Sequence, residues 1–346
     1  MLPGRAFQSR PTRIPIAPGS TLESLLGTLI AANHILHHNG VVDAYGHVSV
    51  RNPANPDTFF LAGALAPALV SALEDLVEYH VEDGSPVGDE SAERNGYAER
   101  FIHSEVYKRY KGVKSVVHAH SEAVIPYSIC SVPLRPVFHM GGVMVVAAQQ
   151  ELKRHAGAQV PIFDISLHYT SSDPLHSLLV NNTHLGAALA AGFTPSSSTL
   201  LSKTTSLAKS YLSSTPSAPP PFPTHTTVLM RGHGFTCVGS SIQEAVYRAI
   251  YTCTNARIQT TALSLQNGAN AMAMGEAMSR KRDWMTENRD MGLKGIRYLD
   301  DRECADTAEA SKGHAERPWK LWCKEVEDSG FYTNEVEAAK KESVDE

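Results

Sequence analysis

The stretch VKSVVHAHSE, residues 113–122, reads as a short apolar strand that ends in two histidines, His118 and His120. In a strand, residues i and i+2 point to the same side. The two imidazoles therefore project together, at a spacing that suits two ligands of one metal ion. The alternative is a polar strand end that happens to contain two histidines, and the rest of the chain has to decide between the two interpretations.

Helical and strand patterns alternate on both sides of this stretch. A helix is predicted over 21–40, with Ser20 as its N-cap and Glu23 three residues later, and it stops at Gly40. The alternation predicts an α/β fold with helices on both sheet faces. Strands are expected within 41–53, 57–63, 76–87, 113–120, 134–140 and 226–239, and helices within 91–111, 174–192 and 240–268, with two more in the last 70 residues.

The composition bounds the kind of partner. The chain has 346 residues, 42% hydrophobic and 19% charged, and a formal charge of −5 without a dense Lys/Arg stripe. This argues against a nucleic-acid surface and favours a small molecule or another copy of the chain. No apolar run approaches the ~20 residues that span a bilayer, so no membrane partner is expected. Five scattered cysteines without a C-x-x-C spacing suggest free thiols in a reducing compartment, which makes the cytoplasm the expected location.

A third ligand would come from a distant segment, because catalytic zinc sites use three protein ligands and keep one position open. His233 is the candidate, since it stands at a predicted strand end between two glycines, although a turn histidine would look the same. Glu99 lies on the helix before the H-x-H strand. It is a candidate fourth ligand or general acid/base, and the alternative is a solvated charge on a helix face.

These signals together resemble a known family. Glu99 with RFIH, then VVHAH, then VLMRGHG is similar to the class II aldolase/adducin family, which includes L-fuculose-phosphate aldolase. GHVSVR at 46–51 matches the family's glycine loop, and EAVYRAIYTCTNA matches its long helix. The resemblance implies a three-layer αβα fold with a central mixed sheet. It also implies that His118, His120 and His233 hold the metal and that Glu99 is the catalytic acid/base.

The resemblance also implies a domain organisation. We expect a flexible leader over 1–19, a catalytic domain over 20–275 and a helical C-terminal extension over 276–346. A Ser/Thr/Pro-rich stretch at 193–224 reads as an insertion into the catalytic domain.

Two departures from the family pattern bear on the substrate. Members that handle phosphate carry a Ser-Ser pair before the glutamate and an asparagine in the glycine loop, whereas this chain has Tyr97-Ala98 and His47. A phosphorylated substrate is therefore not expected, and the chain looks closer to a branch around 3,4-dihydroxyphthalate decarboxylase.

Three further residues are candidates for binding the substrate. Arg51 and His47 are candidates for holding a carboxylate, since a guanidinium offers two parallel donors, and the alternative for Arg51 is a structural salt bridge. His139 is a candidate pocket residue or a buried histidine with satisfied hydrogen bonds. A further group, His34, His37 and His38, is expected to face the carbonyl end of its helix and solvent.

The resemblance thus predicts a metal-dependent carbon–carbon lyase, a decarboxylase or an aldolase, that acts through a metal-stabilised enolate on a non-phosphorylated hydroxy-carboxylic or hydroxylated aromatic acid. Zn²⁺ is the expected ion, and Mn²⁺, Fe²⁺ or Co²⁺ are alternatives. Family members form tetramers, so a homotetramer is expected. One alternative is a non-catalytic, adducin-like scaffold, and another is a cupin-type iron oxygenase, which also uses H-x-H but has fewer helices.

Overall fold

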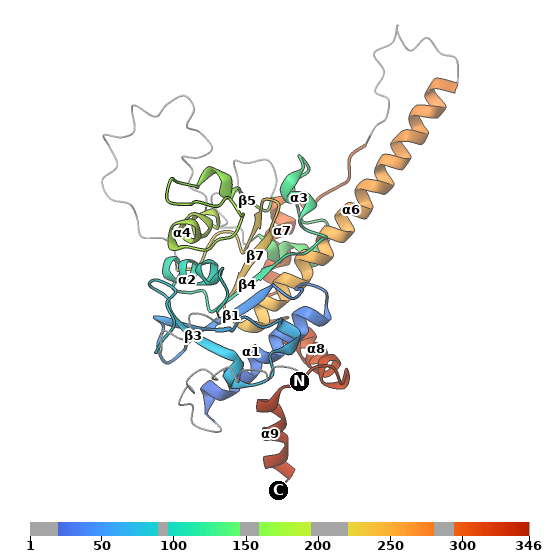
Figure 1. The fold of residues 1–346 in the computed structure, drawn as a ribbon. Helices are drawn as coiled ribbons and strands as arrows, with labels where there is room; N and C mark the ends of the chain where they lie inside the picture. Colours follow the sequence, from blue (N-terminus) through green and yellow to red (C-terminus); the bar gives the residue numbers. More distant parts are fainter. Residues whose placement is uncertain (1–19, 89–95, 146–158, 195–220, 280–293, 346) are drawn as a thin grey trace, which may run out of the picture.

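The computed structural model describes residues 20–88, 96–145, 159–194, 221–279 and 294–345 (Figure 1). The leader expected at 1–19 lies outside these residues, and so does most of the insertion expected at 193–224. Both therefore stay predictions. No helix in the described ranges is both long and apolar enough to cross a membrane.

A mixed sheet of seven strands forms the centre of the molecule, in the order β3-β2-β1-β4-β7-β6-β5. All neighbouring strands are antiparallel except β5 and β6, which are parallel. The strand that carries the H-x-H pair lies in the middle of this order. The strands are β1 His47–Arg51, β2 Thr58–Ala62, β3 Leu76–His80, β4 Ser115–Ala119, β5 Ile162–Phe163, β6 Thr227–Met230 and β7 Gly234–Gly239.

Helices cover both faces of the sheet, as Figure 1 shows. Side chains of α1 and α6 pack on one face, and those of α2 and α4 pack on the other. Within β2, Phe60 and Ala62 enter the first core while Phe59 and Leu61 enter the second, as the two-residue period of a strand requires. The three-layer αβα fold with a mixed sheet is therefore confirmed. The helices are α1 Thr21–His38, α2 Arg100–Arg109, α3 Pro126–Ile129, α4 Thr183–Gly192, α6 Ile242–Ser279, α7 Asp301–Ala310, α8 Glu316–Asp328 and α9 Glu335–Asp345.

Serine side chains cap the starts of two helices, and the cap predicted at Ser20 is confirmed. Ser20 caps α1, and its hydroxyl accepts a hydrogen bond from the Glu23 amide at 3.1 Å. Ser241 caps α6 in the same way, with its hydroxyl 3.1 Å from the Glu244 amide. In both cases the cap satisfies a backbone N–H that has no partner within its own helix.

The strand predicted at 134–140 is wrong, because this segment is irregular and continues into the 3₁₀ turn His139–Met144. Side-chain amides of α6 bond its backbone in place of a neighbouring strand. Asn255 accepts from the Val137 amide at 3.0 Å and donates to the Arg135 carbonyl at 2.8 Å. Gln259 bonds the Arg135 amide and the Pro133 carbonyl in the same manner. Pro133 and Pro136 lack the N–H groups that a strand ladder needs.

The C-terminal part holds three described helices where the sequence suggested two. Trp319, Trp322 and Val326 of α8 are buried in the same apolar core as α1 and α6. Val336 of α9 joins that core. Helices α8 and α9 thus pack against α1 and α6 and share their core.

Candidate metal centre

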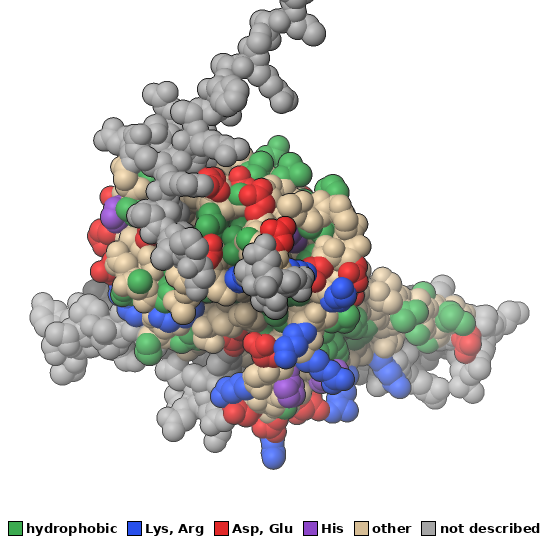
Figure 2. Space-filling view, turned by 90° about the horizontal axis from the view of Figure 1, so that it is seen from below, with side chains coloured by type: hydrophobic (Ala, Val, Ile, Leu, Met, Phe, Trp, Pro, Cys, Tyr) green, Lys and Arg blue, Asp and Glu red, His purple; other side chains and the backbone are tan. Residues whose placement is uncertain are grey.

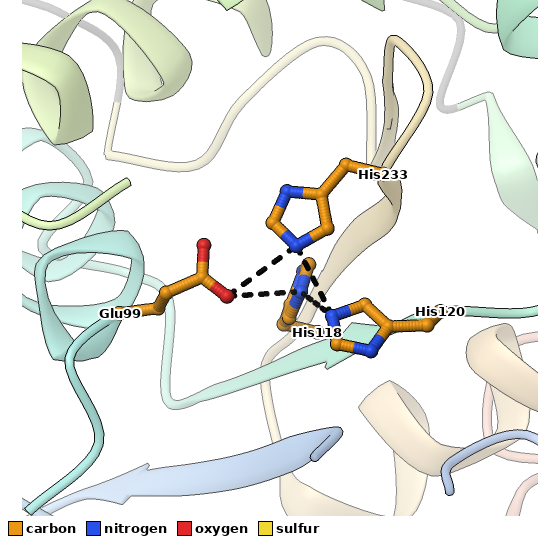
Figure 3. A group of neighbouring side chains, drawn as sticks. All are labelled: Glu99, His118, His120 and His233. Carbon is orange, nitrogen blue, oxygen red and sulfur yellow. Dashed lines mark hydrogen bonds and ion pairs between the residues drawn. The ribbon is translucent and has the colours of Figure 1, made fainter. Parts of the chain in front are cut away.

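Four side chains meet at one end of the central strands (Figure 3). His118 is in β4 and His120 follows it directly, so both leave the strand on the same side. His233 lies in the turn between β6 and β7. Because β4 pairs with β7, with His118 opposite Thr236, this turn comes to the end of the H-x-H strand. Glu99 stands at the N-terminus of α2 and approaches from the neighbouring layer.

Glycine makes the approach of the turn to β4 possible. A Cβ atom at Gly234 would lie 2.1 Å from the Ala119 carbonyl oxygen, which no side chain tolerates. Gly232 has a φ of +66°, a conformation that glycine adopts without steric cost. The two glycines that flank His233 therefore bring this histidine close to β4.

The ligand atoms of the four residues lie within 4.8 Å of one another. Nε2 of His120 is 3.1 Å from Nε2 of His118 and 3.1 Å from Nε2 of His233. The Oε2 atom of Glu99 is 3.4 Å from His233 Nε2 and 3.8 Å from His118 Nε2. Three ring nitrogens and one carboxylate oxygen thus face a common point.

Neighbouring groups favour ring tautomers with a free Nε2 lone pair. His118 Nδ1 lies 3.3 Å from the Thr236 hydroxyl, which itself donates to the Met230 sulfur, so the hydroxyl accepts from the Nδ1–H group. His120 Nδ1 lies 3.6 Å from an oxygen of Asp43. A carboxylate behind a histidine orients the ring and raises its basicity as a ligand.

His118 and His120 are held in the neutral form that a metal ligand needs. Burial lowers the pKa of His118 well below its usual value, and the nearby rings of His233 and His47 lower it further. The pKa of His120 is lowered by burial and by His233, and Asp43 and Glu99 partly offset this. At neutral pH both Nε2 atoms therefore keep their lone pairs.

This donor set fits a divalent metal ion. Two ligands about 2.1 Å from one ion, at tetrahedral to octahedral angles, are about 3.0–3.4 Å apart, and the observed spacing of 3.1 Å falls in this range. Converging lone pairs at this distance repel one another unless a cation lies between them. Three imidazoles with one carboxylate suit Zn²⁺ and its first-row neighbours better than Mg²⁺ or Ca²⁺.

One oxygen of Glu99 is held by a backbone amide, and the other faces the histidines. Its Oε1 atom accepts a hydrogen bond from the Val180 amide at 2.9 Å, while Oε2 points at the histidines. The residue is 7% exposed, so the solvated helix-face interpretation does not apply. A carboxylate held in this way can bind the ion or move a proton next to it.

His47 lies on the buried side of the metal centre, next to His118. It is only 1% exposed, and its ring stands 5.0 Å from that of His118. Its Nδ1 is 2.6 Å from Nε2 of His103, whose other nitrogen is 2.6 Å from the Ser49 hydroxyl. The prediction that His47 holds a substrate carboxylate does not fit this burial. The contacts make it a support for His118.

Arg51 is placed in a structural role as well. Its guanidinium is buried and donates to four backbone carbonyls, those of Pro56, Tyr107, Tyr110 and Val113. Four of the five N–H donors of the guanidinium are used in this way, so no pair of parallel donors is left for a substrate carboxylate. The prediction of Arg51 as a carboxylate ligand is therefore corrected, and its function is to tie β1 to the end of α2.

The remaining histidines lie outside the cluster. His139 is exposed at the start of its 3₁₀ turn with its ring against Phe138, so the buried interpretation does not fit, and a place in the pocket stays a prediction. His34 is buried, and its Nε2 lies 2.6 Å from the Val70 carbonyl. His37 is half-buried and meets the Tyr332 hydroxyl at 2.9 Å, so these two contact the protein, whereas His38 is exposed to solvent as expected.

A cavity of about 500 Å³ adjoins the site on the side of His120. Asp43 and Arg257 line it from opposite elements, the α1–β1 loop and helix α6, and Arg257 supplies the one positive charge among its lining residues that is not a histidine. The sequence analysis missed both residues. Asp43 lies three positions before the glycine loop, which is the only feature of the local sequence that marks it. No feature of the local sequence marks Arg257.

The family of the chain follows from its sequence match. Residues 27–260 match the family described as Class II Aldolase and Adducin N-terminal domain, a span that includes Glu99 and all three histidines. This chain belongs to the class II aldolase and adducin family, as its motifs predicted.

Particular relatives narrow the comparison. Decarboxylase tropJ of Talaromyces stipitatus is 43% identical over 307 residues, which are 89% of this chain and 96% of the relative. The 3,4-dihydroxyphthalate decarboxylase of Arthrobacter keyseri is 26% identical over 225 residues, 63% of this chain and 71% of the relative. The aldolase II superfamily protein from Pseudomonas syringae has a TM-score of 0.57 at 18% identity, over 92% of this chain and 96% of that structure, and shows the shared fold.

Proposed function

We propose that this chain is a metal-dependent carbon–carbon lyase, and specifically a decarboxylase of a non-phosphorylated hydroxylated aromatic or hydroxy-carboxylic acid. The observation that carries the proposal is the convergence of three Nε2 atoms and one Glu99 oxygen on a single point. The family membership and the 43% identical decarboxylase support a lyase as the class of activity.

In the proposed site, His118, His120 and His233 hold the ion and Glu99 moves the proton. When bound, a divalent ion supplies Lewis acidity to adjacent substrate oxygens. The bond between the substrate carbon and its carboxylate breaks, CO₂ leaves, and the electron pair stays on the carbon. Glu99 takes the proton of the substrate's hydroxyl group on Oε2 and returns it to that carbon after CO₂ has left, so that the hydroxyl oxygen is left as the anion and takes its proton back from water, while the Val180 amide keeps the carboxyl group oriented.

The surroundings of Glu99 support a substrate without a phosphate. The hydroxyl of Tyr97, two residues before Glu99, donates to the Leu65 carbonyl and is not offered to a ligand. We further propose that Arg257, and not Arg51, meets an anionic group of the substrate, because it lines the cavity beside His120.

Metal analysis followed by a substrate screen tests the proposal. Purified protein is expected to hold about one divalent ion per chain, which alanine at His118 or His233 removes. A screen of hydroxylated aromatic and aliphatic carboxylic acids should then release CO₂ and no aldehyde. Aldehyde formation would favour an aldolase. Protein without metal would favour a non-catalytic scaffold, and metal with O₂ consumption would favour an oxygenase.

A further inference from the structure

Residues 168–182 form a long connection that is held in one shape by its own hydrogen bonds. They join the 3₁₀ turn Ile165–Leu167 to α4, on the β5 side of that helix in Figure 1. The Asp173 carboxylate accepts a hydrogen bond from the Thr170 amide at 2.8 Å and another from the Asn182 side chain at 2.9 Å. A connection of this length without a helix or strand is uncommon in a compact domain and is usually functional.

Leu178 lies in this connection in a strained backbone conformation. Its φ is +65°, and it is the one non-glycine residue with a positive φ in the part of the chain that the structure describes. In this region the Cβ atom of an L-residue comes too close to the backbone carbonyl oxygen. Such strain persists only where the surrounding structure imposes it, and it gathers at functional sites. Leu178 is therefore held in this conformation by its surroundings.

The Tyr169 hydroxyl makes the polar contact that holds the turn at Leu178. It accepts a hydrogen bond from the Leu178 amide at 2.9 Å. The Tyr169 ring stacks on His176, with ring centroids 4.0 Å apart and planes 6° from parallel. Both Tyr169 and Leu178 also pack against the apolar core that α2 and α4 share. The phenol is thus fixed on two sides, and its hydroxyl has a defined place opposite the Leu178 amide.

The turn at Leu178 directs the amide of Val180 at Glu99. Val180 is fully buried, and its amide donates to Oε1 of Glu99 at 2.9 Å. The other oxygen, Oε2, then lies 3.4 Å from His233 Nε2 (Figure 3). A chain leaves a left-handed residue in a different direction from an extended one. An ordinary φ at Leu178 would therefore turn the Val180 N–H away from the carboxylate.

We infer that Tyr169 is a positioning residue for the proposed reaction. Its hydroxyl holds Leu178 in the left-handed turn, and the turn keeps the Val180 amide on Oε1 of Glu99. This contact fixes the place at which Oε2 takes up and returns its proton. The inference rests on the proposed function, because only proton transfer by Glu99 makes the orientation of this carboxylate matter for the rate.

A double-mutant cycle tests whether Tyr169 acts through Glu99. Tyr169→Phe removes the hydroxyl and keeps the ring, so kcat is expected to fall about tenfold with KM little changed, because orientation is lost and binding is not. In the Glu99→Gln background the same change should have no further effect on the residual rate, since no carboxylic proton is left to direct. Tyr332→Phe, which removes a hydroxyl 2.9 Å from His37 Nδ1, is the matched control and should keep the wild-type kcat.

Hydrogen exchange of the Val180 amide measures the same contact without turnover. The metal-loaded protein is isotope-labelled at its valine nitrogens, so that this amide is followed by itself. Tyr169→Phe should raise its exchange rate several-fold, because the turn that holds it on Glu99 opens more often. Metal content should stay that of the wild type, and Tyr332→Phe should change neither quantity.

Two substitutions at Leu178 separate the backbone turn from side-chain packing. Glycine adopts a positive φ without steric cost but has no side chain, whereas valine keeps an apolar side chain and is strongly disfavoured at a positive φ. Leu178→Gly should therefore retain more of kcat, and slower exchange at Val180, than Leu178→Val. The opposite order would mean that packing holds Glu99 in place, and it would overturn the inference.

The remaining outcomes keep this inference apart from the proposed function. A Val180 exchange rate equal to wild type in Tyr169→Phe overturns the inference, whatever the turnover. An equal loss of kcat in both backgrounds overturns it as well, because Tyr169 would then act independently of Glu99, and so does loss of the metal from Tyr169→Phe. If Glu99→Gln turns over like wild type, or if no acid in the screen reacts, the proposed function fails, and the exchange rates still decide whether Tyr169 orients Glu99.

Discussion

At the scale of single residues, burial and hydrogen bonding separate the groups that can act from those that support them. Glu99 keeps one oxygen directed at the three histidines, whereas Arg51 has its guanidinium used by backbone carbonyls. His47 is as polar as His120, yet it is buried behind His118 and cannot meet a substrate. The chemistry therefore depends on which polar atoms remain without a protein partner.

Glu99→Gln is expected to keep the metal and lose turnover. Glutamine retains an oxygen for the Val180 amide but cannot deliver a carboxylic proton, so kcat should fall about 10²–10⁴-fold. Steady-state kinetics and metal analysis on the same sample measure both effects. Glu82→Gln, a change in an exposed ion pair with Lys108, is the control and should behave as wild type. Turnover at the wild-type rate would remove Glu99 from the mechanism.

Asp43→Asn is expected to weaken metal binding while the fold is kept. An asparagine oxygen can still accept from the Tyr45 and Gly46 amides, but it lacks the charge that faces His120 Nδ1. Loss of such a carboxylate typically lowers metal affinity about 10–100-fold. Competition with a chelator measures this, with Asp57→Asn at an exposed turn as the control. Equal affinity in both variants would mean that Asp43 does not orient the ligand.

At the scale of elements, helix α6 connects the layers of the molecule. Its first half packs against the sheet in one core with α1, and its amides bond the irregular segment 133–137. Its second half leaves the core and carries exposed apolar side chains, on the arm at the right of Figure 2. One helix therefore supports both the sheet and the irregular segment beside it.

Asn255→Ala is expected to destabilise the protein by about 1–3 kcal/mol, because a buried amide and a buried carbonyl of 135–137 lose their partner. The free energy of unfolding from urea titration measures this change. Asn267→Ala, on the exposed part of the same helix, removes an asparagine without that contact and should differ little from wild type. Equal stability of the two variants would mean that the amide bonds do not hold the segment.

At the scale of the whole molecule, a buried polar row links stability to pH. His47, His103, Ser49 and Tyr107 are joined by hydrogen bonds between β1 and α2. Burial lowers the pKa of His103 to about 3. An unfolded chain binds a proton at this histidine near pH 6.5, whereas the folded chain does not until the pH is far lower. The stabilising contribution is therefore present above pH 6.5 and is lost as the pH falls toward 3.

Between pH 7 and pH 5 this one histidine should cost about 2 kcal/mol of stability. The free energy of unfolding is measured by urea titration at both pH values, with chelator present. Its change between pH 7 and pH 5 should be smaller by this amount in His103→Gln than in the wild type. His314→Gln, at an exposed histidine, should keep the wild-type dependence. An undiminished dependence in His103→Gln would assign the acid sensitivity to other groups.

The sequence by itself determined the local features of this protein. Alternation placed Phe59 and Phe60 on opposite sheet faces, and the two-residue period projected His118 and His120 together, because these periods follow from backbone geometry alone. The motifs around Glu99 and His233 were specific enough to predict the family and the fold. Only the tertiary structure decided which polar groups find partners. Arg51, His47 and the segment 134–140 were misjudged because their environment comes from residues far away in the chain, and Asp43 and Arg257 were missed because only folding brings them to His120.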